Sequence, residues 1–328
     1  MLRFFIPENA TAINEMIDAI NGQIEDFLKM EPLQDLLGIL EVDIDTIGQV
    51  YNGRLKANGK VVETQELALP KKLEGKREVL YPVIRELGFF DINKPLRKKN
   101  NRIIILGGSL TACKERTEYA KKWIDDSTCF IDGLACYRPI NPVERSPLAD
   151  FKCDTEFGAM SESFIHVFNL DKAEVTEEFK GDRNLNSISC IKKYSKDGDS
   201  LACRIFAAPS TEPQIRRADT GDTIKFYIRN SDKRNAEDSF LFVTNNRYCN
   251  RQFMQIAYSM KEEKYPIHFD VIGCTPDERI IPVERYDPFQ FIQDLIGVID
   301  WAYRFREKNL RGENNEEYSG EVTKIWRR

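Results

Sequence analysis

Short apolar runs that alternate with helical patterns, from residue 102 onward, constrain the fold of this chain most. The first run, 103–106, is continuously apolar and ends in Gly107-Gly108. Such a run is typical of a strand buried on both faces of a parallel sheet. Further strands are expected at 128–136, 201–208, 240–244 and 267–273, with an additional strand at 187–194. Helices are expected at 111–124, 155–168, 220–229, 248–260 and 288–305.

This alternation predicts an α/β protein with a Rossmann-like, mostly parallel sheet flanked by helices. Residues 1–95 differ, because helical periodicity dominates there: apolar residues are spaced by three and four positions within 11–30, and shorter helices are expected at 33–40, 44–51 and 73–90. Asn58-Gly59 is a strong hairpin signal. We therefore expect an N-terminal helical region with a hairpin (1–95), a Rossmann-like domain (96–306) and a polar C-terminal tail (307–328).

The segment 91–102 joins the two regions and is rich in lysine and arginine. It fits a solvated linker, and a phosphate-contacting strip is the alternative.

The whole chain carries a formal net charge of -5, so a general basic field for nucleic acid is not expected. No secretory signal or apolar run of membrane-spanning length is recognised, and the eight cysteines form no C-x-x-C pair. These features predict a cytoplasmic protein with reduced thiols, no membrane partner and no zinc site.

Residues that follow the predicted strands are the first candidates for a site, because ligands of open α/β sheets bind beyond the carboxyl ends of the strands. Gly107, Gly108 and Ser109 follow the first strand and open a helix, which suits close approach of an anion. Arg138 follows the second strand and is a candidate anion anchor. Glu156 opens the next helix, either as a helix cap or as a general base or hydroxyl acceptor.

The densest polar stretch lies between the strand ending at residue 208 and the following helix. Arg216 and Arg217 would bind an anion, Asp219 and Asp222 would orient a water, hydroxyl or metal, and Thr220 would contact the ligand. The alternative is a helix start stabilised by mutual charge pairing.

A second polar stretch, Thr244, Asn245 and Tyr248, follows the next strand and would contact a base or sugar. Cys274, after the last strand, is a weak candidate nucleophile because buried cysteines are usually inert.

At these residues the chain resembles the YdcF/SanA/ElyC-like family of proteins of unknown function, over about 102–305. The resemblance rests on the strand ending in Leu106-Gly107-Gly108, on Arg116 and on T-E-x-x-A-M at Glu156. It rests also on A-A-P-S at 207–210, on R-R-A-D-T-x-D-T at 216–223 and on V-T-x-x-x-Y at 243–248, which are similar to a soluble bacterial branch.

The resemblance implies a Rossmann-like fold and site positions at Gly107, Gly108, Glu156, Thr220 and Asp222. One branch of the family is reported to bind S-adenosylmethionine, and others affect envelope integrity. This chain departs from the family where N-T-x-E-N is replaced by D-T-G-D-T at 219–223, and where helices at 1–95 replace the membrane helix of the envelope branch.

Three functions follow as hypotheses. The chain binds a small anionic metabolite of nucleotide or nucleoside type, as a hydrolase or transferase with Glu156, Asp219 and Asp222 as catalytic groups. Alternatively, it is a non-catalytic sensor of a nucleotide or S-adenosylmethionine that signals through the N-terminal helices, or a structural module. A divalent metal or S-adenosylmethionine is the cofactor to consider, and a homo-oligomer is the other partner to consider.

Overall fold

The computed structural model describes residues 2–52, 70–90, 94–97, 99–141, 152–181, 184–196, 198, 201–232, 238–265, 268–274 and 287–313. Its helices are α1 (Ile13–Leu28), α2 (Glu31–Leu40), α3 (Ile47–Tyr51), α4 (Arg77–Glu86), α5 (Leu110–Lys121), α6 (Glu156–Phe168), α7 (Thr220–Asn230), α8 (Cys249–Glu262) and α9 (Pro288–Glu313). Short 3-10 helices are η2 (Lys71–Lys76), η4 (Leu185–Ser187) and η5 (Asn246–Tyr248).

The strands are β1 (Arg102–Leu106), β2 (Phe130–Ala135), β3 (Glu174–Lys180), β4 (Ser189–Ser195), β5 (Ala202–Ala207), β6 (Ser239–Asn245) and β7 (His268–Cys274). They form one sheet in the order β3-β4-β5-β2-β1-β6-β7. The five strands from β5 to β7 are parallel, and β4 and β3 continue the sheet antiparallel. The mostly parallel, Rossmann-like sheet flanked by helices is therefore confirmed.

The chain divides into two compact units. One comprises the described residues of 1–4, 17–91 and 275–328, and the other those of 5–16 and 92–274. This division differs from the expected 96–306 domain, because the closing helix α9 belongs to the first unit. In that unit α9 packs against α3 and α4, and Phe291 lies 4.7 Å from Phe90, ring centroid to ring centroid. None of the described helices offers a stretch long and apolar enough to cross a membrane.

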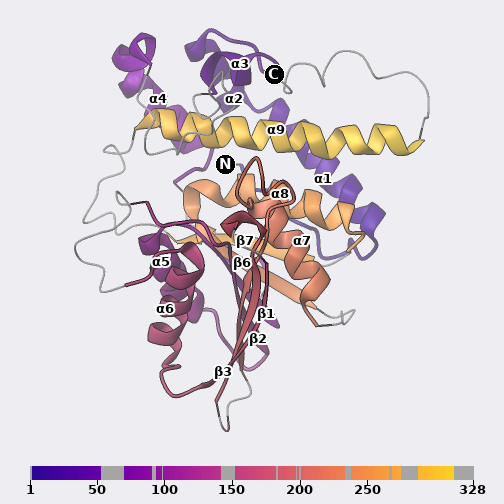
Figure 1. Ribbon diagram of the computed structural model, residues 1–328. Helices are drawn as coiled ribbons and strands as arrows, with labels where there is room; N and C mark the ends of the chain where they lie inside the picture. Colours follow the sequence, from indigo (N-terminus) through magenta and orange to yellow (C-terminus); the bar gives the residue numbers. More distant parts are fainter. Residues whose placement is uncertain are drawn as a thin grey trace. The chain divides into compact units, whose positions relative to one another are not determined.

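The helices of the second unit cover both faces of its sheet (Figure 1). Helices α5 and α6 pack on one face, and α7 and α8 pack on the other. The chain runs from β1 through β2 to β5 in one direction and returns to β6 on the other side of β1. The order of the strands therefore reverses between β1 and β6, where ligands of such sheets usually bind.

Most expected elements lie within a few residues of their predicted ends. Helix α9, expected at 288–305, continues to Glu313, and three further differences occur. The expected helix at 73–90 is split into η2 and α4. Strand β3 was not predicted, because all seven of its residues are exposed and the segment therefore lacks an apolar run. The expected hairpin at Asn58-Gly59 lies outside the described residues.

A buried charged network lies under α7, on the face opposite the main apolar cluster. Arg204 of β5 donates to both carboxylate oxygens of Asp132 of β2, at 2.7 and 2.8 Å. Tyr227 of α7 donates its hydroxyl to the same carboxylate at 2.7 Å. Burial, together with the Asp132 charge, holds the pKa of Tyr227 well above its usual value. The hydroxyl therefore stays protonated and able to donate.

Replacing Asp132 by alanine is expected to lower the free energy of unfolding by about 3–5 kcal/mol, because it removes the buried carboxylate that accepts from both Arg204 and Tyr227. Asp232 is the matched control: it contacts the same arginine, but its side chain is 59% exposed. Asp232→Ala is expected to cost less than about 1 kcal/mol. Urea denaturation measures both, and equal losses would contradict this interpretation of the network.

Candidate functional site

The turn after β1 lies at the reversal point of the sheet and is held by two arginines. Arg116 of α5 is buried, and its Nη1 donates to the carbonyl oxygens of Leu106 at 2.8 Å and of Gly107 at 2.5 Å. Its Nε and Nη2 donate to Oδ1 of Asn245, at the end of β6, at 2.8 and 2.6 Å. One guanidinium therefore joins the ends of the two strands between which the strand order reverses.

Arg138 and Glu156 form the second half of this arrangement. Arg138 Nη2 donates to the carbonyl oxygen of Gly108 at 2.8 Å, and its Nε donates to Glu156 Oε2 at 3.0 Å. Both charged side chains are about nine-tenths buried. The Glu156 amide also donates to the Arg138 carbonyl oxygen at 2.9 Å. We name Gly107, Gly108, Arg116, Arg138, Glu156 and Asn245 the glycine-turn cluster.

Glycine is required at position 107 by its neighbours. A Cβ added there would lie 2.3 Å from Glu156 Oε1 and 2.6 Å from the Leu134 carbonyl oxygen. Gly108 leaves more room, since its nearest neighbour would be the Ala112 Cβ at 3.1 Å. Ser109 then caps α5 by accepting a hydrogen bond from the Ala112 amide at 3.2 Å. The glycines therefore let a buried carboxylate approach the backbone, and the first-turn amides of α5 follow at the same edge.

Helix α6 is capped by Thr155, whose hydroxyl accepts from the Gly158 amide at 3.1 Å. Because Thr155 supplies the side-chain cap, Glu156 is free of that task and instead binds Arg138. This observation favours a role for Glu156 beyond capping.

The thiols near the cluster are not activated. Burial, with the nearby Glu156 charge, raises the pKa of Cys136 to about 12. Burial likewise raises the pKa of Cys274 to about 11. Both thiols are therefore protonated near neutral pH, and neither suits a nucleophile.

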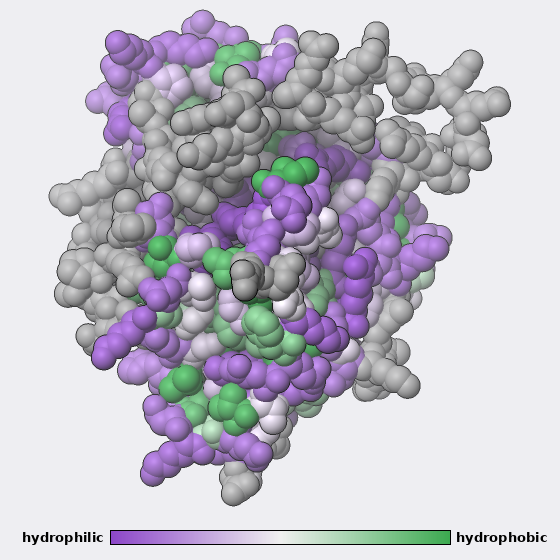
Figure 2. Space-filling view, in the orientation of Figure 1, coloured by the Kyte–Doolittle hydropathy of each residue, from purple (hydrophilic) through white to green (hydrophobic). Residues whose placement is uncertain are grey.

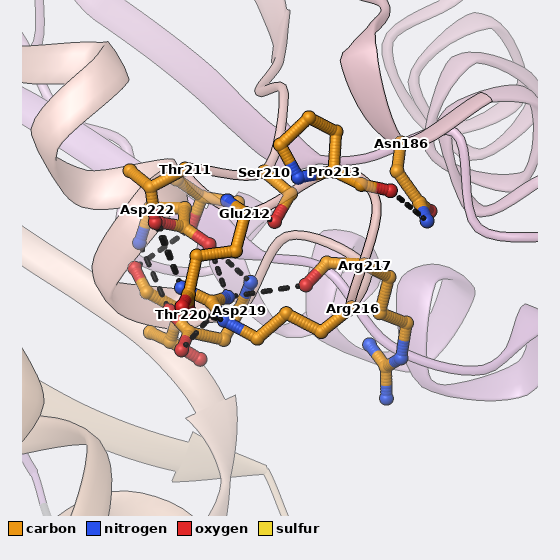
Figure 3. A network of polar contacts seen from close by, with 11 residues as sticks. Asn186, Ser210, Thr211, Glu212, Pro213, Arg216, Arg217, Asp219, Thr220 and Asp222 are labelled. Atoms are coloured by element: carbon orange, nitrogen blue, oxygen red, sulfur yellow. Dashed lines mark hydrogen bonds and ion pairs between the residues drawn. The ribbon is translucent and has the colours of Figure 1, made fainter. Parts of the chain in front are cut away.

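The Thr211–Asp222 segment, after β5, forms a network of its own (Figure 3). Asp219 accepts from the Asp222 amide and Asp222 from the Asp219 amide, both at 3.0 Å, which makes a reciprocal cap at the start of α7. Arg216 donates to Asp222 Oδ2 at 2.5 Å and to Glu212 at 2.8 Å. The Thr211 hydroxyl donates to Asp222 Oδ1 at 2.8 Å. These contacts match the charge-paired helix start that was the alternative interpretation of this segment.

Arg217 takes another direction from Arg216. Its guanidinium points away from the Arg216 network in Figure 3. Its positive charge acts on Cys136, the thiol beside Glu156, where it opposes the effect of burial on the pKa. Arg217 therefore lies within electrostatic range of the glycine-turn cluster. Thr220 is half-buried in the first turn of α7.

The end of β6 carries polar groups that the described protein does not satisfy. The Thr244 hydroxyl and both side-chain amide atoms of Asn246 are buried without a hydrogen-bond partner, and so is Gln252 Oε1. A buried polar atom left without a partner costs about 1–3 kcal/mol. Nearby, the Tyr248 ring lies beneath the guanidinium groups of Arg247, Arg251 and Arg116, whose carbons are 4.5, 4.9 and 5.9 Å from the ring centroid.

Arg116 and Glu115, which carry charge in this region, were not among the sequence-predicted site residues. Arg116 shares a helix face with the buried residues Cys113, Thr117 and Ala120. An arginine among residues that are otherwise suited to burial is the sequence signal that could have identified it. Glu115 interacts with Arg116 and Asn245, and burial raises its pKa against the opposing effect of Arg116. A carboxyl group with a raised pKa suits proton transfer.

The structure thus brings Gly107, Gly108, Arg138, Glu156 and Asn245 together, with Thr244 and Tyr248 beside them on β6 and η5. Arg216, Asp219 and Asp222 bond to one another in the separate segment after β5. Among the described residues, no three histidine, cysteine, aspartate or glutamate side chains gather in an arrangement that could hold a metal ion.

Comparison with known proteins identifies no relative. No family model matches the chain, and neither a curated protein nor a solved structure is significantly similar to it.

Replacing Gly107 by alanine is expected to lower the free energy of unfolding by at least about 2 kcal/mol, because the new methyl group would overlap Glu156 and the β2 backbone. Gly22 is the control, since it lies in α1 with nothing within 4 Å of an added Cβ. Gly22→Ala is expected to stabilise by about 0.5–1 kcal/mol. Thermal and urea unfolding give both values. An unchanged free energy of unfolding in Gly107→Ala would refute the close approach of Glu156 and the β2 backbone to Gly107.

Acid is expected to weaken the segment after β5 through Asp222. Burial acts to raise the pKa of Asp222, but hydrogen bonds from Arg216 and the Asp219 amide outweigh it, so the pKa is lowered. The stabilisation is therefore present above the ordinary aspartate pKa of about 4 and is lost as the pH falls through the lower folded value. Asp222→Asn should flatten the fall in unfolding free energy below about pH 4. An unchanged pH profile in this variant would contradict the assignment.

Proposed function

We propose that this chain binds a small anionic metabolite, of nucleotide or nucleoside type, at the carboxyl ends of β1, β2 and β6. The observation that carries this proposal is the glycine-turn cluster, in which buried Arg116 and Arg138, whose side chain is 10% exposed, both bind the carbonyl groups of a tight turn, and Glu156 pairs with Arg138. Arg217 adds a further positive charge within range. The local balance of charge therefore favours an anion.

The end of β6 provides polar groups for the base or ribose of such a ligand. Unsatisfied hydroxyl and amide groups of Thr244 and Asn246 offer both donors and acceptors, as the edge of a base or a ribose requires. Tyr248 offers an aromatic face close by. A ligand that fits both places needs an anionic group at the glycine turn and an uncharged polar group at the end of β6. A nucleotide-like molecule has both groups, whereas a simple inorganic anion has only the first.

Turnover at this site would use the carboxyl groups that it contains. Glu156 is held by Arg138 and so is oriented as a charged acceptor for a hydroxyl or water. Glu115, with its raised pKa, is the candidate proton donor. These roles describe a hydrolase or transferase. The alternative is a sensor that uses the same site without reaction.

Isosteric replacement of Asn245 by aspartate tests the site directly. A negative charge at the end of β6 is expected to weaken binding of a nucleotide at least tenfold, because it offsets Arg116 and repels the anion. Asn230→Asp makes the same change at an exposed position at the far end of α7 and is expected to leave binding unchanged. The readout is the ligand-induced shift in melting temperature, followed by calorimetry, with nucleotides, S-adenosylmethionine and sugar phosphates, each with and without Mg²⁺.

Wild-type protein that responds to none of these compounds would refute the proposal, as would equal affinity in the two variants. Product formation detected with the bound compound marks an enzyme, and saturable binding without product marks a sensor. Melting curves of the unliganded variants show whether each remains folded.

A further inference from the structure

We propose that the exposed edge of β3 pairs antiparallel with β3 of a second copy of this chain, so that the two sheets continue across a two-fold axis. Strand β3 is the last strand of the sheet in the order β3-β4-β5-β2-β1-β6-β7. Within the described residues it pairs with β4 along one edge over its whole length. Its other edge therefore offers backbone donors and acceptors, which is the usual template for strand addition.

The strand is open to solvent along its whole length. All seven residues, Glu174–Lys180, are exposed, and they include two large apolar side chains. Val175 is 44% exposed and Phe179 is 55% exposed. In the orientation of Figure 2, hydrophobic side chains are visible at the end of the view where Figure 1 labels β3, although hydrophilic side chains dominate this face. Exposed apolar residues on an edge strand suit burial against a partner.

The sequence of β3 is complementary to itself in one register. With Glu177 opposite Glu177 of the second copy, all seven residues are paired. Glu174 then faces Lys180 at both ends, and Val175 faces Phe179 twice. Opposite charges and paired apolar groups across antiparallel strands each stabilise the pairing.

Neighbouring registers lose these contacts. A shift by one residue places Glu174 opposite Phe179, or Val175 opposite Lys180, and breaks both charge pairs. The register with Glu177 opposite Glu177 contains one like-charge pair, which is formed by these two glutamates. Glu177 is bound by Lys192 of β4 at 2.8 Å, and Glu178 by Lys193 at 3.3 Å, so the lysines of β4 offset the acidic centre. The pattern therefore selects a second copy of this chain over an unrelated strand.

Phe179 also joins this edge to the end of β2. Its ring lies 6.1 Å from that of Tyr137, edge to face, and Tyr137 stacks on Phe157 at 5.0 Å. Tyr137 precedes Arg138, and Phe157 follows Glu156. A partner strand that covers Phe179 would thus bury a side chain in contact with the neighbours of the glycine-turn cluster. The pairing itself does not depend on what that cluster binds.

Charge reversal tests the register with the full-length chain. Glu174→Lys places lysine opposite Lys180 at both ends, and Lys180→Glu places glutamate opposite Glu174. Each is expected to weaken dimerisation about tenfold or more, since two attractive pairs become repulsive. The double variant Glu174→Lys/Lys180→Glu restores opposite charges and should dimerise as the wild type does. A mixture of the two single variants should form heterodimers for the same reason.

Sedimentation velocity over a range of concentrations measures the dimer, and circular dichroism and melting temperature check that each variant is folded. Glu118→Lys makes the same charge change on an exposed position of α5 and should leave the dimer intact. A wild type that stays monomeric at about 100 μM would overturn the proposal and mark the edge charges as a guard against association. Unchanged dimerisation in both single variants, or a double variant that does not dimerise as the wild type does, would overturn it as well.

Discussion

The contact on which the candidate site depends is the bridge that Arg116 makes across the reversal point of the sheet. Its guanidinium binds the carbonyl oxygens at the end of β1 and the Asn245 side chain at the end of β6. These two strands are parallel, and the chain leaves β1 for β2 on one side and leaves β6 for β7 on the other, so the loops that follow them separate at this point. With the carbonyl groups of Leu106 and Gly107 engaged by Arg116, the position of the turn is set before any ligand arrives.

The two faces of the sheet differ in the kind of residues that they bury. The α5–α6 face holds the main apolar cluster, and the strand carboxyl ends beside it carry Arg138, after β2, and Glu156, at the start of α6. The α7–α8 face holds the buried Arg204–Asp132 pair with Tyr227. Buried ion pairs contribute little net stability, although losing one partner is costly. This pair therefore serves chiefly to fix β2, β5 and α7 against one another, which in turn sets where the loop after β5 begins.

Much of the fold could be predicted from the sequence, because central parallel strands are apolar on both faces and leave an unmistakable pattern at 103–106 and 240–244. The same argument explains the failure at β3, where exposed Glu174, Thr176 and Glu178 alternate with only two apolar residues. The glycine turn and Arg138 could be predicted from their position after strands. The roles of Arg116 and Glu115 could not, because they depend on contact with Asn245, 129 residues from Arg116 along the chain. The Arg216 and Asp222 pattern, equally suggestive in sequence, forms a self-contained helix cap.

Native mass spectrometry of the purified full-length protein tests the central claim most directly. If the ends of β1, β2 and β6 form a site for an anionic metabolite, the wild type will retain a small phosphate-bearing or nucleoside-type molecule, or acquire one from a mixture of such compounds. A protein that keeps its bare mass, even with nucleotides, S-adenosylmethionine and sugar phosphates at about 1 mM each, would contradict the claim.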